Sequence, residues 1–197
     1  MKSYASTLGC VVALAFAVVA VNSASAQNGP VIPAWVHVGV TVMYDGVSAF
    51  ISNGRPAQPV QVVMTTRVTA VGGGQVSAVT LVQTVGTPLR GSHAWTCNAA
   101  GICRGDATGM NNKFWVDPAN PAASARGPNG EPYTVMGNSP YSYGGKTWAA
   151  TTMSYQNPAN GVQYMCVFET KTGLIVAYSE SNPTQQVHTY LRSVSGQ

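Results

Sequence analysis

Apolar and polar residues alternate along much of this chain, and a period of two is typical of β-strands with one buried face. The alternation is clear over residues 35–44 and again over residues 60–71. Three glycines at 72–74 then predict a turn, and residues 75–85 resume the alternation, so these two stretches predict a β-hairpin. In the first stretch, one face is expected to carry Val36, Val38, Val40, Val42 and Tyr44.

The last third of the chain repeats this pattern in four stretches. They cover residues 147–155, 162–169, 174–181 and 187–194. A turn-rich run at 157–161 and the glycine at position 173 separate the first three, so consecutive strands are expected to pair as hairpins. The sequence therefore predicts about seven strands and no convincing helix. The fold class is all-β: an antiparallel meander curled into a barrel or half-barrel, with a β-sandwich as the alternative.

Residues 86–146 interrupt the alternation. Much of the glycine, proline and asparagine lies here, and only residues 113–116 and 131–136 look like strands. Irregular segments of this length are uncommon in compact domains, and they are often functional or disordered. This one is rich in tryptophan and tyrosine, which disordered segments normally lack. We therefore expect a long loop-rich insertion whose loops are ordered and pack on the sheet.

The N-terminus has the layout of a secretory signal peptide. A lysine follows the first methionine, residues 11–21 are small and apolar, and an Ala-Ser-Ala cleavage sequence occupies 24–26. The apolar run is too short for the roughly 20 residues of a membrane-spanning helix. We expect cleavage of residues 1–26 near Ala26, which predicts a secreted or periplasmic protein. The mature chain, 27–197, is expected to be a single all-β domain without a membrane span.

The charged residues are few and scattered. The chain has 10 lysines and arginines and six acidic residues, and no stretch clusters the basic ones. Nucleic-acid-binding proteins carry a concentrated basic patch, and so do proteins that bind acidic membranes through lysines and arginines. The sequence therefore argues against nucleic acid as a partner and against a polybasic membrane patch.

Two cysteines, Cys97 and Cys103, lie close together in the loop-rich segment. An oxidising compartment favours disulfides, and this pair would close a short ring. The spacing is not the C-x-x-C of redox motifs, and no second pair of ligands at a suitable spacing points to zinc. We predict a structural disulfide; free thiols, a bond to Cys166 and a metal site stay as alternatives.

Cys166 lies in a stretch whose alternate residues are apolar, so we expect it to be a small, buried core residue. The alternative is a nucleophile activated by a histidine base. No local motif supports that chemistry. The histidines that could serve are His37, His93 and His188.

Other catalytic and metal-binding patterns are weak. The histidines are far apart in sequence, so they predict no metal site, and no cofactor motif is present. A glycosidase needs two carboxylates on either side of a sugar, and the loop-rich segment contains three acidic residues: Asp106, Asp117 and Glu131. Their neighbours are typical of turns. A hydrolase is therefore the least favoured function.

Aromatic side chains of the loop-rich segment are the best candidates for contacting a ligand. Flat rings with polar tips can stack on sugars or line a cavity for an apolar molecule. In the last strand, alternate polar residues form a face that could grip an anionic group or a partner. The candidate ligand-binding residues are Trp95, Trp115, Tyr133, Tyr141, Tyr143, Trp148, His188, Tyr190 and Arg192.

These observations favour an exported, non-catalytic binding protein of the periplasm or cell exterior. Its ligand is expected to be a small apolar or amphipathic molecule on the concave face of the sheet, which predicts a cavity inside the sheet. The alternative is an envelope or surface module that binds another protein and has no small ligand. That alternative predicts a filled core with an exposed aromatic patch or a free sheet edge.

Overall fold

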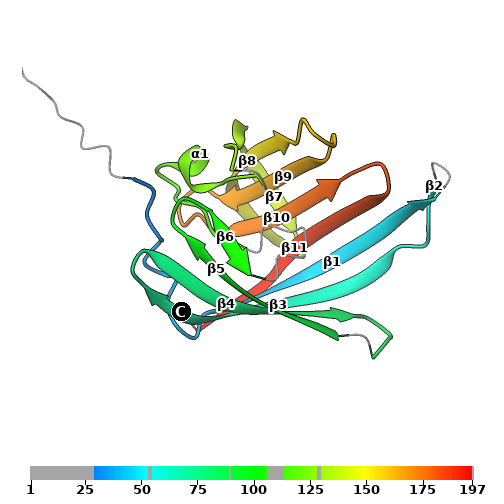
Figure 1. The fold of residues 1–197 in the computed structure, drawn as a ribbon, viewed down its shortest axis with the longest axis horizontal. Helices are drawn as coiled ribbons and strands as arrows, with labels where there is room; N and C mark the ends of the chain where they lie inside the picture. Colours follow the sequence, from blue (N-terminus) through cyan, green and yellow to red (C-terminus); the bar gives the residue numbers. More distant parts are fainter. Residues whose placement is uncertain (1–28, 53–54, 89, 106–112, 128–129, 197) are drawn as a thin grey trace, which may run out of the picture.

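The computed structural model describes residues 29–52, 55–88, 90–105, 113–127 and 130–196, and these form one antiparallel sheet with a very short helix (Figure 1). The elements are β1 (Thr41–Ser52), β2 (Arg55–Pro56), β3 (Val60–Gly72), β4 (Gln75–Thr84), β5 (Arg90–Asn98), β6 (Cys103–Gly105), α1 (Pro121–Ser124), β7 (Thr134–Tyr143), β8 (Lys146–Gln156), β9 (Gln163–Glu169), β10 (Ile175–Ser181) and β11 (Gln185–Ser195). Strands lie side by side in the order β6-β5-β4-β3-β1-β11-β10-β9-β8-β7, and β2 pairs with β1.

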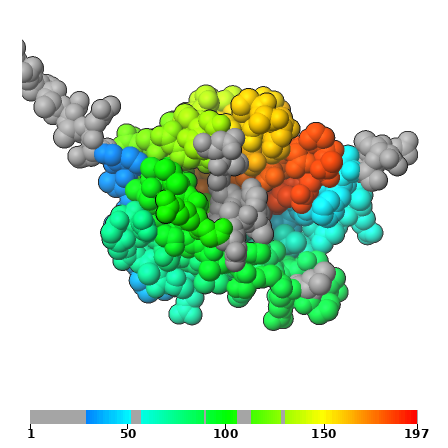
Figure 2. All heavy atoms as spheres, in the orientation of Figure 1, coloured from blue at the N-terminus to red at the C-terminus, as the bar shows by residue number. Residues whose placement is uncertain are grey.

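The sheet is curled but not closed, because its edge strands β6 and β7 do not pair with each other. β1 and β11 join the N-terminal strands to the C-terminal ones, with paired residues from Thr41↔Ser195 to Phe50↔Gln185. In the space-filling view, the N-terminal strands (cyan to green) and the C-terminal strands (yellow to red) form two adjoining halves (Figure 2). The predicted all-β, antiparallel half-barrel is confirmed.

The first strand starts later than its alternation predicted. β1 begins at Thr41, because the Val40 N–H donates to His37 O at 3.2 Å and closes a turn just before the strand. Val38 lies in this turn and is 58% exposed, whereas Val42 is fully buried. The predicted apolar face of five side chains is therefore wrong at Val38, since a turn can imitate a strand's period over a few residues.

The segment 86–146 is more regular than its composition predicted. It contains β5, β6 and β7, so the described residues without strand structure are two short turns, at 86–88 and 144–145, and stretches between residues 99 and 133. Almost all of β7 is exposed, and Pro140 and a β-bulge interrupt it, as is common in edge strands. β5 fully buries only Trp95 and Cys97. Neither strand therefore has enough apolar alternation to be recognised in the sequence.

Residues 113–127, which we call the cover segment, lie beside the start of β10. The Val116 N–H donates to Gly173 O at 2.8 Å, and the Ile175 N–H donates to Phe114 O at 3.0 Å. The strand predicted at the start of this segment is an isolated β-bridge and not a ladder. The cover segment thus follows the sheet without becoming a strand of it.

Two hydrophobic clusters lie on the two sides of the cover segment. The first joins side chains of β1, β3, β4 and β5 and of β8, β9, β10 and β11 to Phe114 and Trp115. The second joins side chains of β8, β9 and β10 to Val116 and Ala125. Trp115 is completely buried. The chain's own aromatic side chains therefore occupy the space between the two halves.

Candidate functional site

A groove of about 610 Å³ opens on the outer face of β4, β5 and β6, and we call it the outer groove. Strand alternation explains its lining. Ala78 and Trp95 are buried on the inner face, so their neighbours Ser77 and Thr96 point outward. The polar residues of the lining are Thr69, Gln75, Ser77, Thr96, Asn98 and Arg104.

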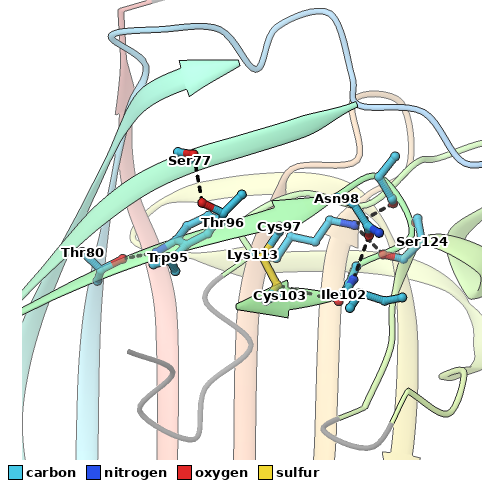
Figure 3. Close-up of a disulfide and its surroundings, with 12 residues drawn as sticks. Ser77, Thr80, Trp95, Thr96, Cys97, Asn98, Ile102, Cys103, Lys113 and Ser124 are labelled. Carbon is cyan, nitrogen blue, oxygen red and sulfur yellow. Dashed lines mark hydrogen bonds between the residues drawn. A yellow bond between two sulfur atoms is a disulfide. The ribbon is translucent and has the colours of Figure 1, made fainter. Parts of the chain in front are cut away.

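Hydroxyl groups follow one another across this groove. Ser77 Oγ and Thr96 Oγ1 lie 2.9 Å apart (Figure 3), and Thr69 Oγ1 donates to Ser77 O at 3.2 Å. The sheet register places Thr96 opposite both Ser77 and Arg104. Because a hydroxyl both donates and accepts, this row can hydrogen-bond to a ligand with either kind of group.

A disulfide between Cys97 and Cys103 holds β6 against β5 (Figure 3). Two hydrogen bonds close the intervening turn: Asn98 N–H donates to Ile102 O at 3.1 Å, and Ile102 N–H donates to Asn98 Oδ1 at 3.0 Å. Arg104 directly follows the second cysteine, so the disulfide also anchors Arg104 beside the groove. The predicted disulfide is confirmed.

Arg104 supplies the charge of the outer groove. It is exposed, and none of the described residues that line the groove carries a carboxylate. Across the described residues the structure shows one ion pair, which joins Arg192 on β11 to Asp45 on β1 at 3.4 Å. The Arg104 guanidinium is therefore available to an anionic group from outside.

Aromatic side chains fill the inner face. Trp95 and Trp115 stack with ring centroids 6.2 Å apart, and the Phe114 ring lies 5.0 Å from that of Trp115. Trp95 Nε1 donates to Thr80 Oγ1 at 2.9 Å (Figure 3). A cavity of about 30 Å³ lies beside Trp115, whereas small-molecule sites occupy about 300–1,000 Å³. This inner cavity is therefore much smaller than the ligand cavity predicted inside the sheet.

A buried lysine lines this small inner cavity. Lys113 is 6% exposed, and its Nζ donates to Ala99 O at 3.2 Å and to Ser124 O. Burial lowers the pKa of Lys113 to about 7, although nearby Cys166 and Asp117 act in the opposite direction. The lysine thus ties the cover segment to the turn that the disulfide closes.

Cys166 is free and buried, as predicted. Burial raises the pKa of its thiol to about 12, so the thiolate does not form near neutral pH. The cavity that it lines contains no histidine. Since the thiolate is the reactive species, a cysteine nucleophile with a histidine base finds no support among the described residues.

Three of the predicted ligand-binding residues belong to the core. Trp95, Trp115 and Tyr133 are each at most 3% exposed. Only Trp95 also borders the outer groove. The tryptophan rings contact each other, while Tyr133 lies in the second cluster, 5.7 Å from the ring of Tyr155. These rings stabilise the fold, and they present no open platform for a sugar.

The other six predicted residues are not among the buried core residues and do not border the outer groove, although Tyr141, Trp148 and Tyr190 pack against the first cluster. Two ring pairs form among them: Tyr143 stacks on Tyr190 with centroids 4.5 Å apart, and Tyr141 lies 6.3 Å from Trp148. The remaining two, on β11, are His188 and Arg192. These rings contact each other and are half-buried, and their role in ligand binding stays a prediction.

Sequence reasoning missed the polar lining of the outer groove and the buried lysine. The groove residues are small polar side chains at outward strand positions, which are ordinary on a solvated face. Lys113 did leave a signal, because it directly precedes the apolar run Phe-Trp-Val. A basic residue at the start of such a run is compatible with either an exposed strand end or a buried site.

The acidic residues do not assemble into a catalytic pair in the described structure. Asp117 has a turn role, since its carboxylate accepts hydrogen bonds from Val31 N and Ala119 N, both at 2.9 Å. Asp106 lies outside the described residues. No group of three potential metal ligands occurs among the described residues. In the same residues no helix is long and apolar enough to cross a membrane.

No family model matches this chain, and no curated protein matches it. Two solved structures resemble it distantly. One is an outer membrane lipoprotein-sorting protein domain from Vibrio parahaemolyticus, with 7% identity, coverage of 80% of this chain and 85% of that chain, and a TM-score of 0.27. The other is a DUF1329 family protein from Desulfovibrio piger, with 6% identity, coverage of 78% and 84%, and a TM-score of 0.26. At these TM-scores the likeness carries no argument about the function of this chain.

Proposed function

We propose that this chain is an exported, non-catalytic binding protein whose ligand occupies the outer groove. The ligand class that fits the groove best is a hydroxyl-rich molecule bearing an anionic group, such as an acidic oligosaccharide. One observation carries the proposal. The described lining combines hydroxyl and amide side chains with a single arginine, and none of its described residues is a carboxylate.

The size and polarity of the groove suit such a ligand. Its volume of about 610 Å³ falls within the range of small-molecule sites. The Ser77 and Thr96 hydroxyls can hydrogen-bond to sugar hydroxyls. Val79 and Ala94 add apolar surface between the polar groups, and the C–H face of a sugar ring can pack there. This combination favours a carbohydrate over a purely apolar molecule.

Arg104 would bind the anionic group. A guanidinium is planar, always charged, and able to donate two parallel hydrogen bonds to one carboxylate or phosphate. The disulfide at the preceding residue, Cys103, limits the movement of its backbone. A ligand with an acidic group is therefore expected to bind more tightly than its neutral counterpart.

Export is supported by the disulfide, because such bonds persist in oxidising compartments. The signal peptide over residues 1–26 lies outside the described residues and stays a prediction. Together they favour the periplasm or the cell exterior. A hydroxyl-rich, acidic ligand also suits that location, where envelope polysaccharides are exposed.

The earlier expectation of an apolar ligand on the concave face would require a different arrangement of the core. A lipid there would have to displace Phe114 and Trp115, which are 2% and 0% exposed. Removing such rings from a core is strongly unfavourable. We therefore assign the ligand to the outer groove and not to the interior.

The alternative of an envelope module that binds another protein is favoured by the sheet edge. β7 is an exposed edge strand, and Val135 and Met136 are 44% and 65% exposed. The filled core also fits that alternative. Against it, the bulge and Pro140 in β7 are features that hinder pairing with a further strand. Chemical crosslinking of the secreted protein in its native envelope would reveal such a partner.

Isothermal titration calorimetry with matched probes tests the proposal. A short oligogalacturonide and a neutral, α-1,4-linked galacto-oligosaccharide of the same length differ mainly in carboxylates. We expect the acidic probe to bind more tightly, and Ser77→Ala with Thr96→Val to weaken both. Arg90→Gln is the matched control. Arg90 is exposed and lies on β5, the strand that carries Thr96, but it does not line the groove. Equal affinity for both probes, or no binding of either, would contradict the proposal.

A further inference from the structure

Two tyrosine rings stack on each other although their strands do not pair. Tyr143 is the last residue of β7, and Tyr190 lies on β11. The ring centroids are 4.5 Å apart, and the ring planes differ by 15°. β8, β9 and β10 lie between these strands in the sheet, so a flat sheet would separate β7 from β11 by about 19 Å. The end of the β7–β8 hairpin must therefore bend over the sheet to bring the rings together.

The hairpin turn fixes the position of Tyr143. Gly144 and Gly145 connect β7 to β8 with φ values of 58° and 76°, and positive φ at both central residues is the geometry that two-residue hairpin turns favour. Next to Tyr143, Ser142 Oγ lies 2.8 Å from Thr147 Oγ1 on the facing strand. Tyr143 is thus held at the end of a tight hairpin.

Tyr190 is held by the strands on both sides of β11. Its backbone is paired with Asp45 on β1 and with Ala177 on β10, and its side chain packs against the first hydrophobic cluster. Both tyrosines of the stacked pair are half-buried. The pair is therefore accessible to a small oxidant, while each ring is partly shielded from the rings of a second molecule.

We propose that Tyr143 and Tyr190 are a site of oxidative cross-linking and form an intramolecular dityrosine. The co-reactant is a one-electron oxidant, such as a haem peroxidase supplied with hydrogen peroxide. Each phenol gives up one electron and one proton, which leaves two phenoxyl radicals. The radicals couple through ring carbons next to the oxygens, and a C–C bond forms. Each coupled carbon then loses its hydrogen as a proton and each oxygen regains one, while one hydrogen peroxide is reduced to two waters.

The separation of the rings matches the product of this reaction. In dityrosine the two centroids are separated by one C–C bond and two ring radii, about 4.3 Å. The stacked pair, at 4.5 Å, is already near this value. Coupling requires the rings to turn edge to edge, but it requires little change in their separation.

Other tyrosine pairs are farther apart. The rings of Tyr133 and Tyr155 are 5.7 Å apart, and those of Tyr155 and Tyr164 are 5.8 Å apart. These three residues belong to the second hydrophobic cluster and are buried. We therefore expect the oxidant to link Tyr143 to Tyr190 in preference to these buried pairs.

A third phenol, Tyr141, lies beside the stacked pair. Burial raises the pKa of Tyr141, and the neighbouring Tyr190 and Tyr143 raise it further. The ring of Tyr141 pairs with that of Trp148, 6.3 Å away. Tyr141→Phe is the matched control, because it removes a neighbouring phenol from the same strand and leaves both stacked rings in place.

Mild oxidation of the secreted, purified protein tests this inference independently of the outer groove. The protein is kept dilute so that molecules rarely meet, treated with a haem peroxidase and hydrogen peroxide, and then quenched with catalase. We expect dityrosine fluorescence in the monomer. Mass spectrometry of the digested protein should find two peptides joined through Tyr143 and Tyr190, two hydrogens lighter than the separate peptides. The linked protein should unfold at a higher urea concentration, because the bond closes a long loop of the unfolded chain.

Conservative variants identify the linked residues. Tyr143→Phe and Tyr190→Phe each keep a ring and remove a phenol, and we expect each to abolish the intramolecular link. Tyr141→Phe should keep the wild-type yield, and oxidation in denaturing urea should lose the preference for this pair. The inference is overturned if the native monomer contains no dityrosine, if both stacked-ring variants keep the wild-type yield, if Tyr141→Phe abolishes the link, or if the linked peptides join other tyrosines.

Discussion

The outer groove lies on the outer face of β5, and the inner cavity lies beside Trp115, which stacks on the inward-facing ring of Trp95 on the same strand. On the outer face of β5, Thr96 lines the outer groove of about 610 Å³ together with other hydroxyl side chains and Arg104. Inward, Trp95 packs on Trp115, and about 30 Å³ remains beside that ring. The outer groove is open to solvent, and its arginine, Arg104, is exposed. The inner cavity has aromatic neighbours, and its lysine, Lys113, is buried.

Adjacent residues of β5 serve separate purposes, because strand alternation turns Trp95 toward the core and Thr96 toward the groove. A surface arginine costs little to keep in water, so it can be reserved for a ligand. A buried lysine is held only by specific partners, since burying an unpaired charge is very costly. Substitutions in the outer groove should therefore change ligand affinity without changing stability. Substitutions around the inner cavity should change stability without changing ligand affinity.

The largest expected effect is on stability, from Trp115→Ala. Trp115 is completely buried and contacts Trp95 and Phe114, so its removal should lower the free energy of unfolding by about 3–5 kcal/mol. Urea unfolding followed by circular dichroism would measure it. Trp148→Ala, at a half-buried position, should cost less. If both variants lost the same free energy of unfolding, Trp115 would contribute no more to the core than the half-buried Trp148.

Removing the disulfide should affect both sides of β5. Cys97→Ser with Cys103→Ser should lower stability by about 2 kcal/mol, as expected for so short a ring. It should also weaken binding of the acidic oligosaccharide, because Arg104 loses its anchor. Unfolding curves and calorimetry on the same protein would measure the two effects. Unchanged binding with lowered stability would show that Arg104 does not depend on the disulfide.

Stability should also depend on pH through Lys113. Burial lowers its pKa from 10.5 to about 7, so between pH 7 and pH 9 the unfolded chain binds a proton that the folded chain has released. Stability should therefore rise by about 2 kcal/mol across this window.

Lys113→Met should abolish that rise, and urea midpoints across the pH range would show it. Between about pH 9 and pH 10.5 the rise should level off, because burial raises the pKa of Cys166 from 9.0 to about 12 and the unfolded thiol ionises first, which opposes the effect of Lys113. Above pH 10.5 the cysteine effect remains and stability should fall. A wild-type profile that is flat from pH 7 to pH 9 would contradict the assignment of a neutral buried amine.

The smallest free-energy change is expected for Arg104→Gln. It should weaken binding of the oligogalacturonide about tenfold, which corresponds to about 1.4 kcal/mol. Stability should stay within about 0.5 kcal/mol of the wild type, as for most surface substitutions. Affinity for the neutral probe should not change. If stability fell instead and both probes bound equally, the outer groove would be a structural feature only.

The sequence predicted the strands that bury one face and failed for those that do not. Residues 60–71 and 75–85 alternate because their inner side chains meet the core, and β3 and β4 appear there. β7 was not predicted over its length, since an exposed edge strand has no buried face to leave a pattern. The turn before Thr41 was mistaken for a strand for the opposite reason, because apolar residues happen to alternate there.

The sequence by itself determined the all-β class, the antiparallel hairpins, the disulfide and the burial of Cys166, because these depend on local periodicity, spacing and compartment. Only the tertiary structure decided which face the cover segment fills. That packing joins residues far apart in the chain, such as Lys113 and Tyr178. It also decided that Ser77, Thr96 and Arg104 share one groove, since strand register and sheet curl bring them together. No local pattern encodes such long-range neighbours.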